Sequence, residues 1–398
     1  MAHPTFDRDG LARLDHAMAG HARNGGVPGL VWLVARHGEV HTGAAGSLDG
    51  ASGRPVRQNT IFRISSMTKP VTAVAALVLV DEGRLGLDEP VDRWLPELAD
   101  RRVLASPTGP LDVTVPARRP VTTRDLLTFR MGLGADFTGV PQPVMEAMAK
   151  LELGVGPPAP AVPPAPDEWI RRLGTLPLEH HPGERWMYHT SADVLGVLVA
   201  RAADQPFDVF LAERVFAPLG MVDTGFFVLP DARDRFGPCY WPPGAGVEDT
   251  LYDPVDGQWS GPPAFPGGGA GLVSTAGDYL AFAEMLLGGG TYRGRRLLSG
   301  ASVDAMVTNH LTPAQIAASG PDPGGAMGWG FGVGVQLRST GPRSVGTYGW
   351  DGGLGSTWAN DPAEALVGVL LTNQTWMSPE PPPVCREFWT ATYAALVR

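Results

Sequence analysis

Cysteine and long apolar runs are scarce in this 398-residue sequence. Cys239 and Cys385 are too few for a disulfide framework, and their spacing is not that of a metal site. We therefore expect a reduced, cytoplasmic protein without a bound metal. The longest apolar run, Val71 to Val80, has about half the length that a bilayer requires, and the stretch up to Asn24 carries charges throughout. We expect neither a signal peptide nor a membrane partner.

Positive charge is scarce too. The sequence has 31 lysines and arginines against 41 aspartates and glutamates, which gives a formal net charge of −10. No basic run exceeds two residues, so we expect no nucleic-acid partner. Lys69 and Lys150 are the only lysines, and the other 29 basic residues are arginine. Arginine does not deprotonate near neutral pH. A lysine kept in such a chain is therefore a candidate for acid–base chemistry.

Glycine and proline are abundant instead, with 52 and 39 residues, which indicates long loops and turns. Six prolines fall within residues 154–166, and we expect a stiff loop there that acts as a lid or as an interface. A second loop-rich segment, residues 237–271, carries the aromatics Trp241, Tyr252, Trp259 and Phe265. These aromatics either line a substrate pocket or only pack, and the sequence leaves both open.

Apolar periodicity predicts the regular elements. The expected helices are residues 7–24, 66–82, 122–127, 191–203, 278–287 and 383–397, and the expected strands are residues 30–35, 40–45, 330–337, 344–349, 356–360 and 366–371. The helix over 66–82 is apolar on all sides, so we expect it to be buried. Strands at both ends with helices between them predict an antiparallel sheet built from both termini, with a helical region inserted.

The sequence Ser66-Met67-Thr68-Lys69 at the start of the buried helix is the sharpest chemical signal. Residues three apart lie on one helical face, so the Ser66 hydroxyl can meet the Lys69 amine. A serine hydroxyl is a weak nucleophile until a base accepts its proton, and burial can lower the pKa of a lysine until it serves as that base. Pro70 supports a helix start near Ser66, since proline is tolerated in the first helical turn.

Further segments surround this motif, namely Phe62 to Pro70, Asp81 to Val91, Thr122 to Thr128, Pro182 to Tyr188 and Gly267 to Thr275. Together they resemble the serine β-lactamase and penicillin-binding-protein superfamily, most closely its class C β-lactamase branch and the related family VIII carboxylesterases. The resemblance implies a β-lactamase/transpeptidase-like α/β (α+β) fold, an antiparallel sheet flanked by helices with an inserted, mostly helical domain. We expect residues 1–61 and 262–398 to form the sheet domain and residues 62–261 the helical domain.

The second element of this family is Tyr-x-Asn, which reads Tyr188-His189-Thr190 here. The resemblance implies that Tyr188 lies beside Ser66 and Lys69 and carries a proton to and from the serine and the leaving group. A nearby Lys⁺ is expected to lower the pKa of this phenol, so that Tyr188 can act as a base. Thr190 in place of Asn offers a hydroxyl to the substrate and weakens the case for lactam binding.

The third family element is Lys-Thr-Gly, and its place is taken by Trp350-Asp351-Gly352-Gly353. Without that lysine, no cation holds a lactam carboxylate, and Trp350 offers an apolar wall suited to neutral esters or amides. The resemblance assigns substrate contacts to Trp350, Asp351 and Gly352. By the same analogy, the N–H groups of Gly353 and Ser66 form an oxyanion hole.

Other catalytic patterns are missing. The sequence contains no Gly-x-Ser-x-Gly elbow, phosphate loop or dinucleotide fingerprint. His180, His181 and His189 lack zinc spacing, and we expect them to be loop or structural residues.

These observations predict a serine hydrolase, a carboxylesterase that cleaves small neutral esters through an acyl-enzyme on Ser66. Lys69 and Tyr188 are the base and proton shuttle, and no cofactor is needed. Three alternatives stay open: a biosynthetic acyltransferase with the same mechanism, a β-lactamase or D-amino-acid peptidase, and a non-catalytic binding module of the same fold. The expected partner is a small-molecule ester or amide, and the sequence does not indicate the oligomeric state.

Overall fold

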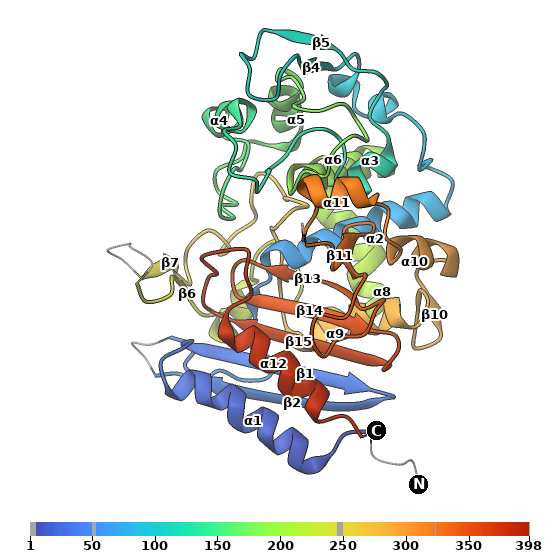
Figure 1. The fold of residues 1–398 in the computed structure, drawn as a ribbon. Helices are drawn as coiled ribbons and strands as arrows, with labels where there is room; N and C mark the ends of the chain where they lie inside the picture. Colours follow the sequence, from blue (N-terminus) through green and yellow to red (C-terminus); the bar gives the residue numbers. More distant parts are fainter. Residues whose placement is uncertain (1–4, 50–52, 245–249, 323, 398) are drawn as a thin grey trace.

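An antiparallel sheet built from both ends of the chain forms the base of the fold (Figure 1). The computed structural model describes residues 5–49, 53–244, 250–322 and 324–397. Within these residues, seven strands pair in the order β11-β12-β13-β14-β15-β1-β2, each antiparallel to its neighbours. Their bounds are β1 Gly29–Arg36, β2 Glu39–Gly46, β11 Met327–Trp329, β12 Gly334–Gln336, β13 Tyr348–Gly352, β14 Ser356–Asp361 and β15 Leu366–Thr372. The predicted sheet is confirmed.

The remaining described elements are helices and short paired strands. The helices are α1 Arg8–Arg23, α2 Thr68–Asp81, α3 Thr123–Leu127, α4 Pro143–Lys150, α5 Pro166–Gly174, α6 Thr190–Ala203, α7 Phe207–Leu211, α8 Ala217–Leu219, α9 Ala276–Leu287, α10 Gly300–Met306, α11 Pro313–Ser319 and α12 Pro383–Ala394. The paired strands are β3 Phe62–Arg63 with β8 Val273–Ser274, β4 Arg102–Leu104 with β5 Thr114–Pro116, β6 Cys239–Tyr240 with β7 Leu251–Asp253, and β9 Thr291–Tyr292 with β10 Arg295–Arg296. Over the described ranges, none of the helices has the length and apolar character to cross a bilayer.

Strand β1 shows why the sheet is covered on both faces. Successive side chains of a strand point to opposite sides, and nearly all of β1 is apolar and buried. Alternate residues enter two separate clusters: Leu30, Trp32 and Val34 pack with residues of α1 and α12, whereas Val31, Leu33 and Ala35 join the main core. In Figure 1, α1 and α12 lie side by side along the lower part of the sheet, with the helical region above it.

Helix α2 lies in the main core and packs against α6. Every residue from Thr68 to Leu79 is buried, as the apolar sequence predicts. The α-helix starts at Thr68 because residues 65–67 form a 3-10 turn ahead of it. Gly83 follows the helix with φ +70°, a left-handed conformation that glycine adopts without strain.

Two predicted strands differ from their expected ranges. The strand expected over 330–337 is shorter and runs from Gly334 to Gln336. The strand expected over 344–349 runs from Tyr348 to Gly352, because the Ser344 N–H donates to Asp361 Oδ2 in the turn before it. The division into a sheet domain and a helical domain stays a prediction. Strand β3, from the expected helical domain, pairs with β8, from the expected sheet domain. The two expected domains are therefore joined by backbone pairing next to Ser66.

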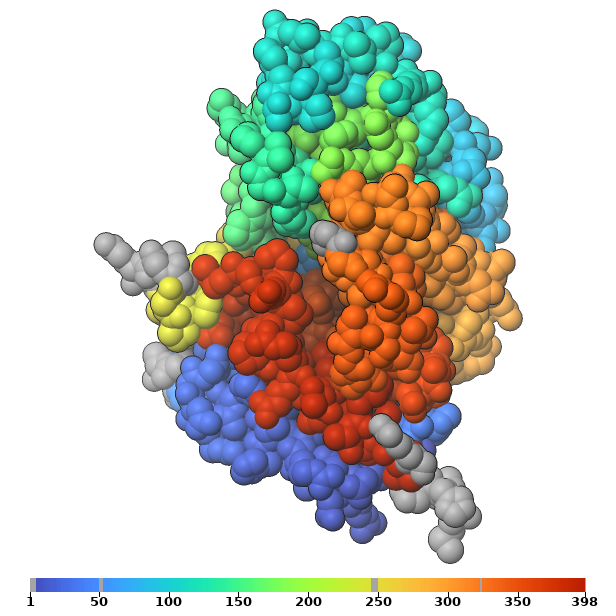
Figure 2. Space-filling view, viewed as in Figure 1, coloured from blue at the N-terminus to red at the C-terminus, as the bar shows by residue number. Residues whose placement is uncertain are grey.

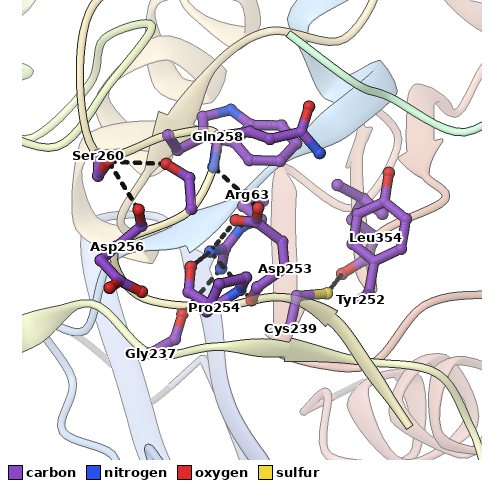
Figure 3. Close-up of polar contacts among 12 residues, drawn as sticks. Arg63, Gly237, Cys239, Tyr252, Asp253, Pro254, Asp256, Gln258, Ser260 and Leu354 are labelled. Carbon is purple, nitrogen blue, oxygen red and sulfur yellow. Dashed lines mark hydrogen bonds and ion pairs between the residues drawn. The ribbon is translucent and has the colours of Figure 1, made fainter. Parts of the chain in front are cut away.

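A buried ion pair anchors the chain just before Ser66 (Figure 3). The side chains of Arg63 and Asp253 are 3% and 2% exposed. Arg63 Nε and Nη2 donate to Asp253 Oδ2 at 2.9 and 2.5 Å, and Nη1 donates to the Gly237 carbonyl at 2.8 Å. The guanidinium also lies 4.0 Å from the centre of the Phe236 ring. The loop-rich segment after residue 236 is therefore tied to β3, the strand that leads into Ser66.

We predict that Asp253→Ala lowers the free energy of unfolding by about 3–5 kcal/mol, because Arg63 then becomes a buried charge without its partner. Urea denaturation measures this change. Glu168→Ala is the matched control, since Glu168 pairs with Arg171 and Arg172 on the surface and exposed ion pairs contribute little. Equal losses in the two variants would contradict the anchoring role of Arg63.

Candidate active site

Ser66 lies in a rigid turn between β3 and α2. The Ile64 N–H donates to Leu272 O at 3.0 Å, and the Tyr279 hydroxyl donates to Met67 O at 2.9 Å. Ser65, directly before Ser66, has φ +46°, which non-glycine residues adopt only when their surroundings impose it. Ser66 itself is 8% exposed. In Figure 2 the surface is hollowed where the green, orange and red parts of the chain meet, above β13 and α2 of Figure 1.

Lys69 is buried against Ser66, as the spacing of the motif predicts. Its Nζ lies 2.9 Å from Ser66 Oγ, 3.1 Å from His189 Nδ1 and 2.6 Å from the Gly269 carbonyl oxygen. Burial lowers the pKa of Lys69 to about 7, although the nearby Asp193 carboxylate acts in the opposite direction. A large share of the Lys69 amine is therefore neutral at physiological pH and can accept a proton.

The glycine-rich segment lets the backbone approach this lysine. A Cβ atom at Gly269 would lie 2.8 Å from His189 Nε2 and 3.0 Å from Asp193 Oδ1, which is closer than side chains can tolerate. The Gly269 N–H donates to Asp193 Oδ1 at 2.8 Å, and its carbonyl accepts from Lys69. Glycine at 269 therefore leaves room for the side chains of His189 and Asp193 beside the backbone groups that contact the site.

Tyr188 lies over Lys69, but its pKa differs from the expectation. The Lys69 Nζ is 4.5 Å from the centre of the Tyr188 ring, so the ammonium faces the ring rather than the hydroxyl. Burial raises the pKa of Tyr188 to about 12, although hydrogen bonds with Ser66 and Trp350 act the other way. The expected lowering of this pKa is wrong. Tyr188 keeps its proton at neutral pH and is suited to donate it.

Trp350 takes part in the same cluster. Its Nε1–H donates to the Tyr188 hydroxyl at 2.8 Å, and its ring meets Trp329 edge to face at 4.6 Å between ring centres. Phe137, which is 61% exposed, lies 5.5 Å from the Tyr188 ring. Aromatic rings therefore pack around Tyr188 next to Ser66, with Phe137 on the exposed side and Trp329 buried. Sequence reasoning found Trp350 but not Trp329 or Phe137.

His189 lies in a turn, as expected of a loop residue, but it also contacts the site, because its Nδ1 is 3.1 Å from Lys69 Nζ. Tyr188, His189 and Thr190 form a tight three-residue turn, in which His189 has φ +78° and ψ −67° and the Thr190 N–H donates to Tyr188 O at 3.2 Å. Such a γ-turn is rare and strained. It places Tyr188 and His189 on the same lysine, and His189 Nε2 lies 3.1 Å from Asp193 Oδ2.

The structure does not bring every predicted substrate contact to this cluster. Thr190 is 2% exposed in the first turn of α6, so it presents almost no surface to a substrate. Asp351 follows Trp350 on β13 and faces the other side of the sheet, where it lines a cavity with Arg343 and Trp389. Burial raises the pKa of the Asp351 carboxyl, and Thr357 hydrogen-bonds it. The substrate contacts expected of Thr190 and Asp351 are not supported.

The two glycines after Asp351 lie near Ser66. A Cβ at Gly352 would come within 2.2 Å of the Ile64 carbonyl, so glycine allows β13 to pass beside the turn that holds Ser66. Gly353 is exposed in the turn after β13, where its N–H is not used by β13. This placement is compatible with an oxyanion hole formed with Ser66, which stays a prediction.

The proline-rich loop forms one wall beside the site. Residues 153–163 line a small cavity of about 50 Å³ with His189, Asp193 and Phe265, which is room for a few water-sized groups. The Tyr252 hydroxyl donates to Pro158 O, and the Ala161 N–H donates to Gln258 Oε1 at 3.3 Å. The loop is therefore hydrogen-bonded to the segment 237–271, and its role as a lid or an interface stays a prediction. Of the aromatics in 237–271, Phe265 lines the cavity, whereas Trp259 packs beside Arg63.

A serine in contact with a buried, partly neutral lysine is the arrangement of enzymes that transfer acyl groups through a serine. The chain belongs to the beta-lactamase family, whose model matches residues 13–382. It is therefore a serine hydrolase of the superfamily and fold that its motifs predict. Among the described residues, no group of histidine, cysteine, aspartate and glutamate side chains is arranged to hold a metal ion.

Known relatives support this assignment. Protein Rv1367c of Mycobacterium tuberculosis (strain ATCC 25618 / H37Rv) is 42% identical over 313 residues, which cover 78% of this chain and 74% of the relative. Esterase EstB of Burkholderia gladioli is 34% identical over 385 residues, 92% of this chain and 91% of EstB. The solved structure of EstCE1, described as a hydrolase with promiscuous acyltransferase activity, matches with a TM-score of 0.79 at 26% identity and covers 97% of this chain and 99% of EstCE1.

We predict that the rate at which a fluorophosphonate labels Ser66 rises with pH through about 7 and then levels. The neutral Lys69 amine, which takes the Ser66 proton, predominates above its pKa of about 7. Below that pKa the rate should fall about tenfold for each pH unit. Lys69→Met removes the amine and should label slowly at every pH, whereas Lys150→Arg should leave the profile unchanged. A wild-type rate that does not vary between about pH 5 and pH 9 would contradict Lys69 as the base.

Proposed function

We propose that this chain is a carboxylesterase that hydrolyses small, neutral, short-acyl esters through an acyl-enzyme on Ser66. The observation that carries the proposal is the hydrogen bond from Trp350 Nε1 to the Tyr188 hydroxyl at 2.8 Å. An uncharged indole, in contact with Trp329 and Tyr188, therefore lies beside the residue next to the reacting serine, and Phe137 packs on the Tyr188 ring. Such an aromatic cluster binds an apolar ester group and provides no cation for a substrate carboxylate.

Acylation uses the two proton carriers in different roles. Neutral Lys69 accepts the proton of Ser66 as Oγ bonds to the ester carbonyl carbon, and the carbonyl oxygen takes the charge. The Ser66 and Gly353 N–H groups are the proposed donors to that oxygen. As the C–O bond to the alcohol breaks, Tyr188 gives its proton to the leaving oxygen, and Lys69 keeps the proton of Ser66 until deacylation. The alcohol leaves, and Ser66 holds the acyl group.

Deacylation runs the same steps with water. A water molecule gives a proton to the Lys69 and Tyr188 pair as its oxygen attacks the acyl carbon. The bond to Ser66 Oγ then breaks, and the serine recovers its proton. An alcohol or amine acceptor in place of water would give acyl transfer by the same route. The names of EstB and EstCE1 support ester chemistry with transfer as a side activity.

The proposed preference for a short acyl group does not rest on the cavity beside the proline-rich loop. That cavity is lined mainly by apolar groups, including Phe265, but not by Ser66, Lys69 or Tyr188. We further propose a cytoplasmic location, supported by Cys239 and Cys385, which are both free and buried. The proposed partner is a small ester or amide.

We predict that the protein hydrolyses p-nitrophenyl esters, with kcat/KM highest at acetate to butyrate and falling by octanoate. Ser66→Ala should remove this turnover, since the nucleophile is lost. Ser65→Ala is the matched control, because Ser65 is the buried neighbour without a contact to Lys69, and it should keep most of the activity. Turnover of a chromogenic cephalosporin without ester turnover would overturn the proposal in favour of a β-lactamase. Efficient turnover only after an alcohol or amine acceptor is added would favour an acyltransferase.

A further inference from the structure

The three partners of the Lys69 amine determine where its lone pair points. A neutral amine has two N–H donors and one lone pair, and Lys69 Nζ has three neighbours within hydrogen-bond distance. The Gly269 carbonyl can only accept, so it takes one N–H. The second N–H goes to either His189 or Ser66, and the lone pair faces the other. The protonation of His189 Nδ1 therefore decides whether Lys69 is set to receive the Ser66 proton.

Asp193 fixes the protonation of that imidazole. Its Oδ1 accepts the Gly269 N–H at 2.8 Å, and its Oδ2 lies 3.1 Å from His189 Nε2. A carboxylate at this distance attracts a positive hydrogen and repels a lone pair, so it favours the imidazole with its hydrogen on Nε2. Nδ1 is then a lone pair that accepts from Lys69. With Gly269 and His189 taking both N–H groups, the remaining lone pair of Lys69 faces Ser66 Oγ.

The hydrogen bonds of Tyr188, on the other side of Ser66, are consistent with Ser66 donating to Lys69. The Tyr188 hydroxyl accepts from Trp350 and interacts with Ser66, so its own hydrogen is available to Ser66 Oγ. With a neutral Lys69, Ser66 is then free to donate to the Lys69 lone pair across the 2.9 Å contact. Each hydrogen along Trp350, Tyr188, Ser66 and Lys69 then has one acceptor.

We propose that Asp193 and His189 are positioning residues that fix the imidazole tautomer and thereby aim the lone pair of Lys69 at Ser66. Two features of the backbone hold His189 against Lys69. His189 is held in the strained γ-turn, and glycine stands at 269, where a Cβ would strike the imidazole. The proposal rests on the proposed function only in taking Ser66 as the nucleophile, and it does not depend on the ester specificity.

Asp193→Asn tests the tautomer directly. The Gly269 N–H requires the amide oxygen, so the amide NH₂ faces His189 Nε2 and makes it an acceptor. The imidazole hydrogen then moves to Nδ1, and the Lys69 lone pair turns to it instead of to Ser66. We expect the plateau rates of ester hydrolysis and of fluorophosphonate labelling to fall about 100-fold. The acid limb of the pH profile should move to lower pH, because the Asp193 charge that raises the pKa of Lys69 is lost. A shifted limb with an unchanged plateau would overturn the proposal.

Two amide variants of His189 separate positioning from packing. His189→Asn puts a carbonyl oxygen near the place of Nδ1, so it can accept from Lys69 and should retain activity within about tenfold of wild type. His189→Gln reaches toward Asp193 but leaves Lys69 without that acceptor, so it should lose about 100-fold in the plateau. Its acid limb should move to lower pH, because an acceptor that favours the charged amine is lost.

Each result decides for or against the tautomer. Equal losses in the two His189 variants with unmoved acid limbs would assign His189 a structural role and overturn the proposal. If Asp193→Asn does not fold by circular dichroism, the His189 pair decides alone. Fluorophosphonate labelling keeps the test independent of substrate: wild type that is labelled but hydrolyses no ester defeats the proposed function, while the ratio of labelling rates among variants still tests the tautomer.

Discussion

The arrangement around Ser66 depends on keeping the Lys69 amine buried and largely uncharged. Removal from water favours the neutral amine, and the Asp193 carboxylate opposes this, which leaves the pKa near 7. The burial comes from α2, whose residues are buried from Thr68 to Leu79. The partners of the amine come from segments about 120 and 200 residues away. The helical region and the segment after residue 262 must therefore close on α2 before Lys69 has its ordinary hydrogen bonds.

Local sequence spacing predicted the parts of the fold and the site that are themselves local. The Ser66–Lys69 contact follows from one helical turn, and the sheet follows from short apolar runs at both ends of the chain. The contacts of Lys69 with His189 and Gly269 join distant segments, and no spacing rule predicts them. The sequence did contain a signal for the His189–Asp193 pair, since the two residues lie four apart at a helix start. The histidines were compared only with zinc-site spacing, so this signal was missed.

Two mistaken expectations have different physical causes. Trp350 and Asp351 are consecutive residues of a strand, so they must face opposite sides, and the strand itself already argued against a shared substrate role. The pKa of Tyr188 could not be read from the sequence. It depends on whether Lys69 meets the hydroxyl or the ring face, and on how fully the phenol is removed from water.

The indole of Trp350 matters for the protonation of the whole cluster. It gives Tyr188 a hydrogen bond at 2.8 Å without adding charge. A lysine at this position would also donate to Tyr188, but its positive charge would lower the pKa of both the phenol and the Lys69 amine. Lys69 would then be a weaker base, and Tyr188 would tend to become one. With an uncharged donor at 350, the resting site contains a neutral base, a neutral serine and a phenol that keeps its proton. In the proposed mechanism, the division of roles between Lys69 and Tyr188 therefore depends on the uncharged residue at 350, which also provides no cation for an anionic substrate.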